Sequence, residues 1–509
     1  MNRAFCLLLL SMPAFGQQMT ERAAARFLEQ ATWGPTAQQT AAVAKTGIFP
    51  WLLAQFRAPM SDLPDQALLA ANGNQNTDLS AVQAAFFENA VNGGDQLRQR
   101  VAFILSQMWV VSQVTVRPAY AFPPYWRILR DNAFKNYREI IRAVTLSPAM
   151  GTYLNMANNN KGNASKGTSA NENYARELMQ LFTLGLTELN PDGSPVLDAN
   201  KNPVPTYNQA VVTNMAKLLT GWTYPTAPGA TAKNNNPAYY FGPMHAVETE
   251  HDTTAKTIFN NLSLPAGQTA EQDLDKLLDD LIAQPTMAPF VSRQFIQHMV
   301  TSNPSPAYVQ RVSEVFTNTR GDMKSMIVAI LTDPEARAGD PAGAPVVASF
   351  GHLREPVLFL AGMLRSLNAT VGSANSLNKY ANELSQNLFN SPSVFSYFSP
   401  QNRIAGGLFG PEFQIYSTQT ASYRADIINT AIYGKLDTTT TLDLSPFTAK
   451  AGSVGNMVDY IGTVLLHGAM SSTLAQAATA AATAQSGAAS KAQAALYVVL
   501  TSNEYQTIH

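Results

Sequence analysis

The chain has 509 residues, of which 46% are hydrophobic and only 14% charged, and its formal net charge is −1. These values exclude intrinsic disorder, because disordered chains combine low hydrophobicity with a high net charge. They also exclude a basic nucleic-acid-binding protein, since 34 Lys and Arg residues are balanced by 35 Asp and Glu residues. The length suffices for roughly two to four domain-sized units with a large buried core.

The first 16 residues have the pattern of a secretory signal peptide. Residues 1–3 form a short positive region, residues 4–10 an apolar stretch, and residues 14–16 a small-residue cleavage site. We therefore expect a bacterial protein that is secreted or periplasmic, with Gln17 as the first mature residue. Cleavage would remove Cys6, the one cysteine, and so exclude disulfides and thiolate sites. No later apolar run reaches the ~18 residues of a membrane-spanning helix, so no membrane insertion is expected.

Apolar residues recur at helical spacing along most of the chain, and alternating strand patterns are nearly absent. The sequence therefore predicts an all-α, multi-helical globular array with long polar loops. We expect three helical regions, at residues 17–150, 151–345 and 346–509. Long irregular stretches are expected at 157–170, which is almost entirely polar, at 223–250, and at 391–411, which mixes Phe, Tyr, Gly and Pro. The expected helices are 22–29, 78–91, 95–114, 136–145, 171–184, 207–220, 270–283, 287–300, 323–331, 357–366 and 412–432.

The densest group of polar side chains lies between residues 161 and 185, where a glycine-rich loop leads into a predicted helix. Ser169 and Glu172 have the spacing of a capping box, in which each side chain bonds the backbone of the other residue. Asn171 lies in the first turn of the predicted helix, and Gly185 suits the residue that ends it.

One interpretation of this group is a ligand site. The free N–H groups at the start of the helix, together with Lys161 or Lys166, would bind an anionic group. Glu172 or Glu177 would act as general acid or base, and Arg176 would set the local charge or clamp the substrate. The structural alternative is a capped helix that carries charged pairs one turn apart.

A second group, residues 245–252, holds two histidines, two glutamates and an aspartate. His245, His251 and a neighbouring acid could bind a metal ion, although their spacing matches no standard zinc motif. His251 and Asp252 could instead act as a general base, and a solvated acidic loop is the structural alternative. Trp222, which precedes this loop, would either contact a ligand or anchor the loop to the core. The sequence identifies no particular cofactor.

Other motifs of known chemistry are absent from the sequence. It contains no G-x-S-x-G nucleophile elbow, no H-E-x-x-H zinc motif and no Walker A loop. His298 is expected on a helix near the edge of the core. His352 and His467 have no local partners in the sequence, and we expect them to be structural.

These segments together resemble a bacterial family described as domain of unknown function 1800, from about residue 23 to the C-terminus. The most specific motif is residues 171–185, NENYARELMQLFTLG. Members of this family look like exported helical proteins, and they often accompany a second family that resembles sulfatases and alkaline phosphatases. The supporting segments are 219–222, 251–252 with 256–257, 321–323 with 332–335, and 391–395.

The chain departs from the family pattern in one segment. Family members often carry a stretch with histidine and tryptophan where residues 103–110 read FILSQMWV, with Trp109 and no histidine. A mechanism that needs a histidine on this helix is therefore not expected in this protein. The resemblance implies a site among Asn171, Glu172, Arg176, Glu177, His251 and Asp252, but it implies no reaction.

We therefore expect an exported helical protein that acts on or binds extracellular polymers, most plausibly glycans. The expected site is a polar cleft around residues 171–177 and 251–252, with two carboxylates flanking the sugar bond if the protein is a hydrolase. Two alternatives remain open at this point. One is a scaffold or assembly factor for a co-exported sulfatase-like or phosphatase-like partner, and the other is a metal-dependent hydrolase.

Overall fold

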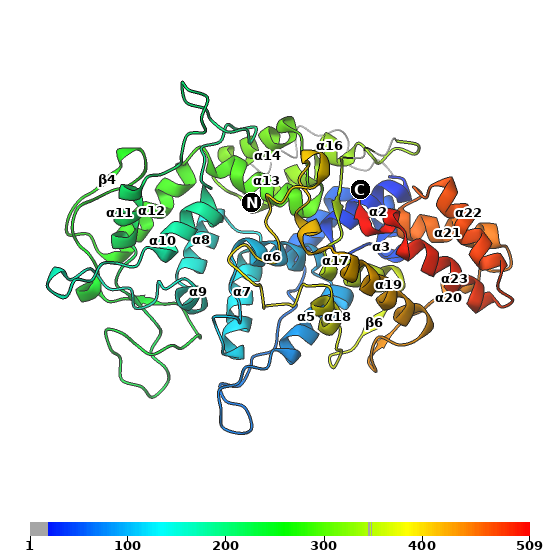
Figure 1. Ribbon diagram of the computed structural model, residues 1–509, viewed down its shortest axis with the longest axis horizontal. Coiled ribbons are helices and arrows are strands. Elements are labelled where there is room, and N and C mark those ends of the chain that lie inside the picture. Colours follow the sequence, from blue (N-terminus) through cyan, green and yellow to red (C-terminus); the bar gives the residue numbers. More distant parts are fainter. Residues whose placement is uncertain (1–18, 345–346, 348) are drawn as a thin grey trace.

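The computed structural model describes residues 19–344, 347 and 349–509 (Figure 1). The predicted signal peptide, residues 1–16, lies outside the described residues. The rest of the chain is mostly helical, which confirms the predicted all-α fold. No helix in the described part combines the length and apolarity that crossing a bilayer requires.

The helices follow one another as short elements joined by turns and loops. Those in the first third of the chain are α2 (Glu21–Ala31), α3 (Ala37–Thr46), α4 (Ile48–Arg57), α5 (Ser80–Asn92), α6 (Gln96–Met108), η1 (Ala119–Ala121), α7 (Phe122–Asn132), α8 (Tyr137–Thr145) and α9 (Pro148–Tyr153). The middle third contains η2 (Ala164–Lys166), α10 (Asn173–Glu177), the π-helix η3 (Leu178–Thr183), α11 (Gln209–Leu218), η4 (Glu248–Glu250), η5 (Phe259–Asn261), α12 (Ala270–Ala283), α13 (Met287–Met299), α14 (Pro306–Asn318), α15 (Met323–Thr332) and α16 (Pro334–Arg337).

The C-terminal part continues in the same style. Its helices are α17 (Pro356–Ser366), α18 (Asn378–Glu383), η6 (Ala405–Gly407), η7 (Pro411–Ile415), α19 (Thr418–Tyr433), α20 (Ser445–Thr448), α21 (Val454–Leu466), α22 (Ser472–Thr483), α23 (Ala488–Thr501) and α24 (Asn503–Gln506). The strands have two residues each and pair antiparallel: β1 (Trp222–Thr223) with β2 (His245–Ala246), β3 (Lys256–Thr257) with β4 (Ser263–Leu264), β5 (His352–Leu353) with β8 (Thr507–Ile508), and β6 (Thr370–Val371) with β7 (Thr440–Thr441).

Figure 1 shows these elements as a broad array, with α8 to α12 at one end and α19 to α23 at the other. Helices α5, α6, α7 and α17 lie between the two ends. Buried apolar side chains form one cluster that includes residues from Ala24 to Ile508. The three regions expected from the sequence therefore share a single core.

Two predicted helices are shorter than expected. The helix expected at 95–114 ends at Met108, because the carbonyl of Trp109 accepts a hydrogen bond from the Tyr125 hydroxyl at 2.5 Å instead of continuing the helix. The helix expected from residue 412 begins at Thr418, where Ser417 and Thr420 form a capping box. Residues before it form the separate 3₁₀ helix η7.

Helix α6 is buried on nearly every side, and it carries charge into the core. Each of its residues except Ser106 is buried, including Arg98 and Arg100. The Arg100 guanidinium lies 3.8 Å from the Glu355 carboxylate and donates a hydrogen bond of 2.6 Å to the His298 carbonyl. These contacts join α6 to the start of α17 and the end of α13. A buried guanidinium requires such partners, because desolvation of an unpaired charge is very costly.

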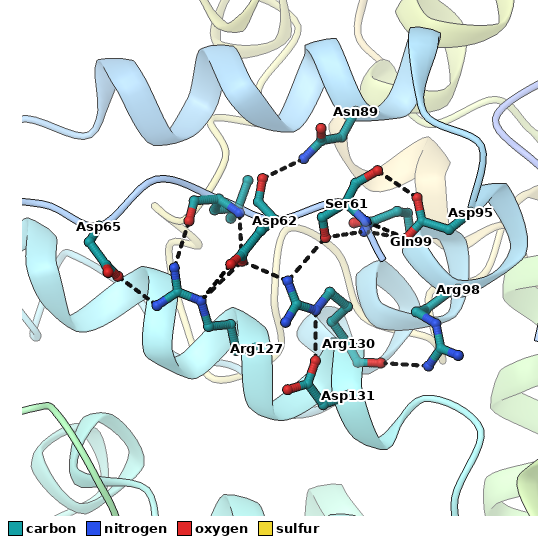
Figure 2. A network of polar contacts seen from close by, with 11 residues as sticks. Ser61, Asp62, Asp65, Asn89, Asp95, Arg98, Gln99, Arg127, Arg130 and Asp131 are labelled. Carbon is teal, nitrogen blue, oxygen red and sulfur yellow. Dashed lines mark hydrogen bonds and ion pairs between the residues drawn. The ribbon is translucent and has the colours of Figure 1, made fainter. Parts of the chain in front are cut away.

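A second polar network holds the start of α6 in place (Figure 2). Asp95 is fully buried and accepts hydrogen bonds from the Ser61 amide at 3.0 Å, the Ser61 hydroxyl at 2.7 Å and the Gln99 amide at 2.9 Å. Asp62, which follows Ser61 in the loop, pairs with Arg127 at 3.0 Å and with Arg130 at 2.6 Å, both on α7. The loop before residue 65 is thus tied to both α6 and α7.

We expect Asp95→Ala to lower the free energy of unfolding by about 3 kcal/mol, because it removes a buried carboxylate that accepts three hydrogen bonds, from the Ser61 amide, the Ser61 hydroxyl and the Gln99 amide. The control is Asp131→Ala, which removes a partly exposed ion pair with Arg130 and should cost less than about 1 kcal/mol. Urea unfolding followed by circular dichroism measures both. Equal losses in the two variants would contradict the central role of Asp95.

Candidate functional site

The helix that carries the 171–185 motif begins later than the sequence predicted. Helix α10 starts at Asn173, whose backbone N–H donates a hydrogen bond of 2.9 Å to the Asn171 side-chain oxygen. Ser169 is exposed and Glu172 makes no capping bond, so the predicted capping box is wrong. The reason is that the Glu172 carboxylate is bonded to side chains of α11. The helix continues as the π-helix η3, and Gly185 has a φ of +77° after it, as expected of a terminating glycine.

Glu172 and Arg176 do form the predicted pair one turn apart. Arg176 Nη2 lies 2.7 Å from Glu172 Oε2, and Gln209 and Thr213 of α11 donate to Glu172 Oε1 at 3.0 and 3.1 Å. Partial burial raises the pKa of Glu172, but the hydrogen bonds from Gln209, Arg176 and Thr213 outweigh it and hold the pKa below its usual range. Glu172 is therefore an ionised, well-bonded group that lies between two helices.

Glu177 lies on the same helix in a different environment. The carboxylate is half-buried, and its Oε2 atom has no hydrogen-bond partner among the described residues. Burial raises the pKa of Glu177, and the charge of Arg176 offsets only part of this effect. Of the two glutamates proposed as general acid, Glu177 has the environment that favours the protonated form.

His251 is fully buried and bonded on both sides of its ring. Its Nδ1 lies 3.0 Å from the Thr220 carbonyl, and its Nε2 lies 3.2 Å from Asp273 Oδ2. Lys256 Nζ approaches the same Asp273 oxygen at 2.8 Å. Gly221 permits this packing, because a Cβ there would lie 2.9 Å from the His251 backbone. The predicted role of His251 as an accessible base has no support in this geometry, which makes it part of a buried structural cluster.

Among the described contacts, none of the other predicted residues bonds to the His251 ring. Asp252 accepts hydrogen bonds from the Thr254 amide at 2.9 Å and the Thr254 hydroxyl at 2.5 Å, which form a local turn. Trp222 is 1% exposed, so its ring is part of the core rather than a ligand contact. Lys161 and Lys166 are exposed on the loop at 161–168. The structure pairs Glu172 with Arg176, whereas the His251 ring is bonded to Thr220 and Asp273.

The metal-site alternative finds no matching geometry. His245 is exposed on β2, whereas His251 is buried and engaged with Asp273. Across residues 19–344, 347 and 349–509, no group of three or more His, Cys, Asp and Glu side chains is placed to hold a metal ion.

A cavity of about 250 Å³ lies where α6, η3, α13 and the segment 394–412 meet. Three segments that are far apart in the sequence contribute to its walls: residues 103–110, 171–185 and 391–395. Gly185 is part of this wall and packs closely on α13, since a Cβ at this position would lie 3.0 Å from the Phe290 ring. The lining residues are Gln107, Met108, Gln180, Leu181, Gly185, Leu186, Phe290, Gln294, Gln297, His298, Val394, Phe395, Ser396, Phe398, Ser399, Pro400, Gln401, Pro411 and Glu412.

The lining of this cavity is mostly apolar, and its polar groups carry little charge. Glu412 is the one Asp, Glu, Lys or Arg among the described lining residues, and its Oε1 atom lies 3.1 Å from His352 Nδ1. Burial, together with the charge of Arg100, lowers the pKa of His298 to about 3, so this ring is neutral at physiological pH. One polar atom on each of four lining side chains has no hydrogen-bond partner in the described chain: Gln107 Oε1, Gln294 Nε2, Ser396 Oγ and Glu412 Oε2.

Ser396 in this wall has a strained backbone. Its φ is +64°, a left-handed value that is uncommon for a residue with a side chain. Such strain costs about 1–3 kcal/mol and tends to accompany functional sites. Ser396 is held in this conformation by a turn in which its amide donates to the Ser393 carbonyl at 3.2 Å.

A larger cavity, of about 490 Å³, lies between α2, the segment after α16 and the C-terminal helices. It is the weaker candidate because its charged side chains already have protein partners. Part of its wall also adjoins positions that the structure does not describe. The partnered groups are Arg26 with Asp340, Glu29 with Arg354 and His467, Glu335 with Ser305, and Glu504 with Ser471.

Residues 26–507 match the family described as "Protein of unknown function (DUF1800)". The chain belongs to this family. The match covers nearly all of the described residues, including the three segments that meet at the 250 Å³ cavity. No curated protein and no solved structure matches the chain.

The polar residues of this cavity form no recognisable pattern in the sequence. Gln107, Gln294, His298, Ser396 and Glu412 come from α6, α13, the loop after residue 391 and η7, so no local spacing relates them. A usable signal was present in the family resemblance, because two segments named there, 171–185 and 391–395, lie against the cavity.

We expect His251→Ala to act on stability rather than on ligand binding. The variant removes a buried partner of Asp273, which should cost about 2–3 kcal/mol of unfolding free energy. His245→Ala, at an exposed position of β2, should stay within about 0.5 kcal/mol. Thermal unfolding of the two variants measures this difference. Unchanged stability of His251→Ala would show that the buried cluster is not structural.

The two glutamates of the motif should have opposite effects on the pH dependence of stability. The raised pKa of Glu177 lowers stability as pH rises through the ordinary glutamate value of about 4.3 toward the folded-state value, and the loss persists above it. Glu177→Gln removes this penalty, so the variant should be more stable than the parent at pH 7. The gain should be below about 1 kcal/mol, because the group is partly solvated.

Glu172→Gln is the matched comparison. The lowered pKa of Glu172 gives stability that is present above the unfolded value and is lost as pH falls through the folded one. This variant should therefore be less stable than the parent at pH 7, and both differences should shrink near about pH 3. Urea midpoints at the two pH values test the pair, and a loss of stability in Glu177→Gln at pH 7 would contradict the assignment.

Proposed function

We propose that the protein binds a saccharide unit of an extracellular glycan in the 250 Å³ cavity between α6, η3, α13 and the segment 394–412. The observation that carries this proposal is the chemistry of the wall, where glutamine amides and serine hydroxyls predominate among the polar groups. Amide groups both donate and accept hydrogen bonds, which matches the hydroxyls of a sugar. A cavity of this size lies below the ~300–1,000 Å³ of drug-sized pockets, so it suits one sugar unit.

The apolar part of the wall supports the same ligand class. Phe290 and Phe398 line the cavity, and Phe395 is 46% exposed there. Flat rings of this kind pack against the apolar face of a sugar while amides bond its edge. Leu186, which is 59% exposed, extends this apolar surface beside the same cavity.

Binding, rather than hydrolysis, is the activity that we propose. Glycosidases generally place two carboxylates about 5–10 Å apart across the scissile bond. The described lining of this cavity offers one carboxylate, Glu412, and Glu172 and Glu177 do not line it. We place this activity outside the cytoplasm, in line with the predicted signal peptide.

The test is isothermal titration of the protein with neutral mono- and oligosaccharides. We expect Gln294→Ala and Phe395→Ala to weaken binding by about tenfold or more, because each loses a contact worth roughly 1–2 kcal/mol. Gln476→Ala, at an exposed position of α22, is the control and should bind as the parent does. The proposal fails if no saccharide binds, or if the two cavity variants bind as tightly as the control.

If no saccharide binds, the alternative to test is a scaffold for a co-exported protein. The exposed Leu186 and Phe395 would then be tested as a contact for a co-exported protein, by co-purification from the native extract.

A further inference from the structure

Two arginines beside the cavity stack on one aromatic ring. The guanidinium carbon of Arg293, on α13, lies 4.4 Å from the centre of the Phe409 ring. The guanidinium carbon of Arg403 lies 4.1 Å from the same centre. Two like charges are therefore held close to one ring, although Coulomb repulsion opposes this arrangement.

Neither arginine has a carboxylate partner among the described residues. Arg403 donates to the Gly407 carbonyl at 2.5 Å, and Arg293 forms no side-chain hydrogen bond or ion pair there. Burial, and then the charge of Arg403, lower the pKa of Arg293. Arg311, an exposed arginine elsewhere in the chain, is by contrast paired with Asp333 at 2.7 Å. Arg293 is half-buried and Arg403 is exposed, so an anion that reached both would meet two positive charges that no carboxylate neutralises.

The Phe409 ring leaves N–H donors of both groups available, although Nη1 of Arg403 is already bonded to the Gly407 carbonyl. A guanidinium stacks through its face, while its N–H donors lie in the plane and point away from it. Such donors match the paired oxygens of a carboxylate, sulfate or phosphate. The ring that holds them is itself fixed, because Asn303 bonds both the Phe409 amide at 2.8 Å and the Phe409 carbonyl at 2.9 Å.

Arg293 and Arg403 do not line the cavity, but they lie on two of the segments that form its wall, α13 and 394–412. Arg293 is one helical turn from Phe290 and from Gln297, which both line the cavity. Phe409 precedes the lining residue Glu412 by three positions. The carboxylate of Glu412 would repel an anion inside the cavity, whereas Arg293 and Arg403 would attract one beside it. The charges thus suit a ligand with a neutral ring and an anionic substituent.

We propose that Arg293 and Arg403 bind an oxyanion substituent on the saccharide in the cavity, so that the ligand is an acidic glycan. This inference rests on the proposed function and narrows its ligand class. The substituent is a sulfate ester or a uronate carboxylate, which share the planar or tetrahedral oxygens that guanidinium groups recognise.

The test compares a neutral saccharide with its sulfated and its uronate counterparts of the same length, by isothermal titration of the full protein. The parent should bind at least one acidic ligand about tenfold or more tightly than the neutral one. Arg403→Gln should remove this preference and leave neutral binding within about twofold, because Arg403 is exposed and outside the cavity wall. Arg403→Lys keeps the charge but loses the planar fork, and should fall between the two.

Arg57→Gln, at an exposed position of α4, is the matched control and should bind all three ligands as the parent does. Arg293→Gln should reproduce the effect of Arg403→Gln, with thermal unfolding as the check on its fold. Inorganic sulfate and acetate, titrated alone, show whether the arginine pair binds the anion without the sugar.

The outcomes separate the two proposals. Equal binding of neutral and acidic saccharides by the parent, or an unchanged preference in Arg403→Gln, overturns the arginine pair as an anion site and leaves the saccharide cavity standing. Binding of sulfate or acetate that Arg403→Gln abolishes, without any saccharide binding, supports the anion site and overturns the saccharide cavity. A preference for the sulfated or for the uronate ligand identifies the substituent.

Discussion

The fold depends on neutralising guanidinium groups that have been removed from water. Arg100 on α6 approaches Glu355 at the start of α17, and Arg354 pairs with Glu29 on α2. In each pair, one partner comes from the first hundred residues and the other from the last third of the chain. Breaking a buried pair typically costs about 3–5 kcal/mol, although an intact pair adds little net stability over an apolar one. Such pairs therefore determine which segments may pack together more than how strongly they do so.

The same pairing also builds one side of the candidate site. Gln107 donates to Glu355 at 3.0 Å, so the carboxylate that neutralises Arg100 also orients a side chain of the cavity wall. The oxygen of the Gln107 amide is buried and has no hydrogen-bond partner in the described chain. The position of a side chain in the cavity wall is thus fixed by the way in which charge is balanced behind it.

The sequence predicted the helices well because their apolar periodicity is a local property. Helix α12 begins and ends at the predicted residues, and the alanine-rich segment near the C-terminus forms the two helices α22 and α23. The predictions failed where tertiary contacts replaced local ones. The capping box did not form, for example, because the Glu172 carboxylate is bonded to side chains of α11 instead of the Ser169 backbone. The proximity of Arg293 to Arg403 likewise depends on how a distant loop packs on α13, which no spacing in the sequence reveals.

The π-helix η3 limits how the length of this chain can change during evolution. A turn of π-helix contains one more residue than a turn of α-helix, and the excess lies between Glu177 and Gly185. Losing any one of these residues would restore a regular helix and rotate all that follows by about 100°. Leu181 would then leave the cavity, and the arm at 186–206 would lose its bond from the Leu189 amide to Thr286. Single-residue insertions and deletions should therefore be tolerated in exposed turns such as η6 and selected against in η3.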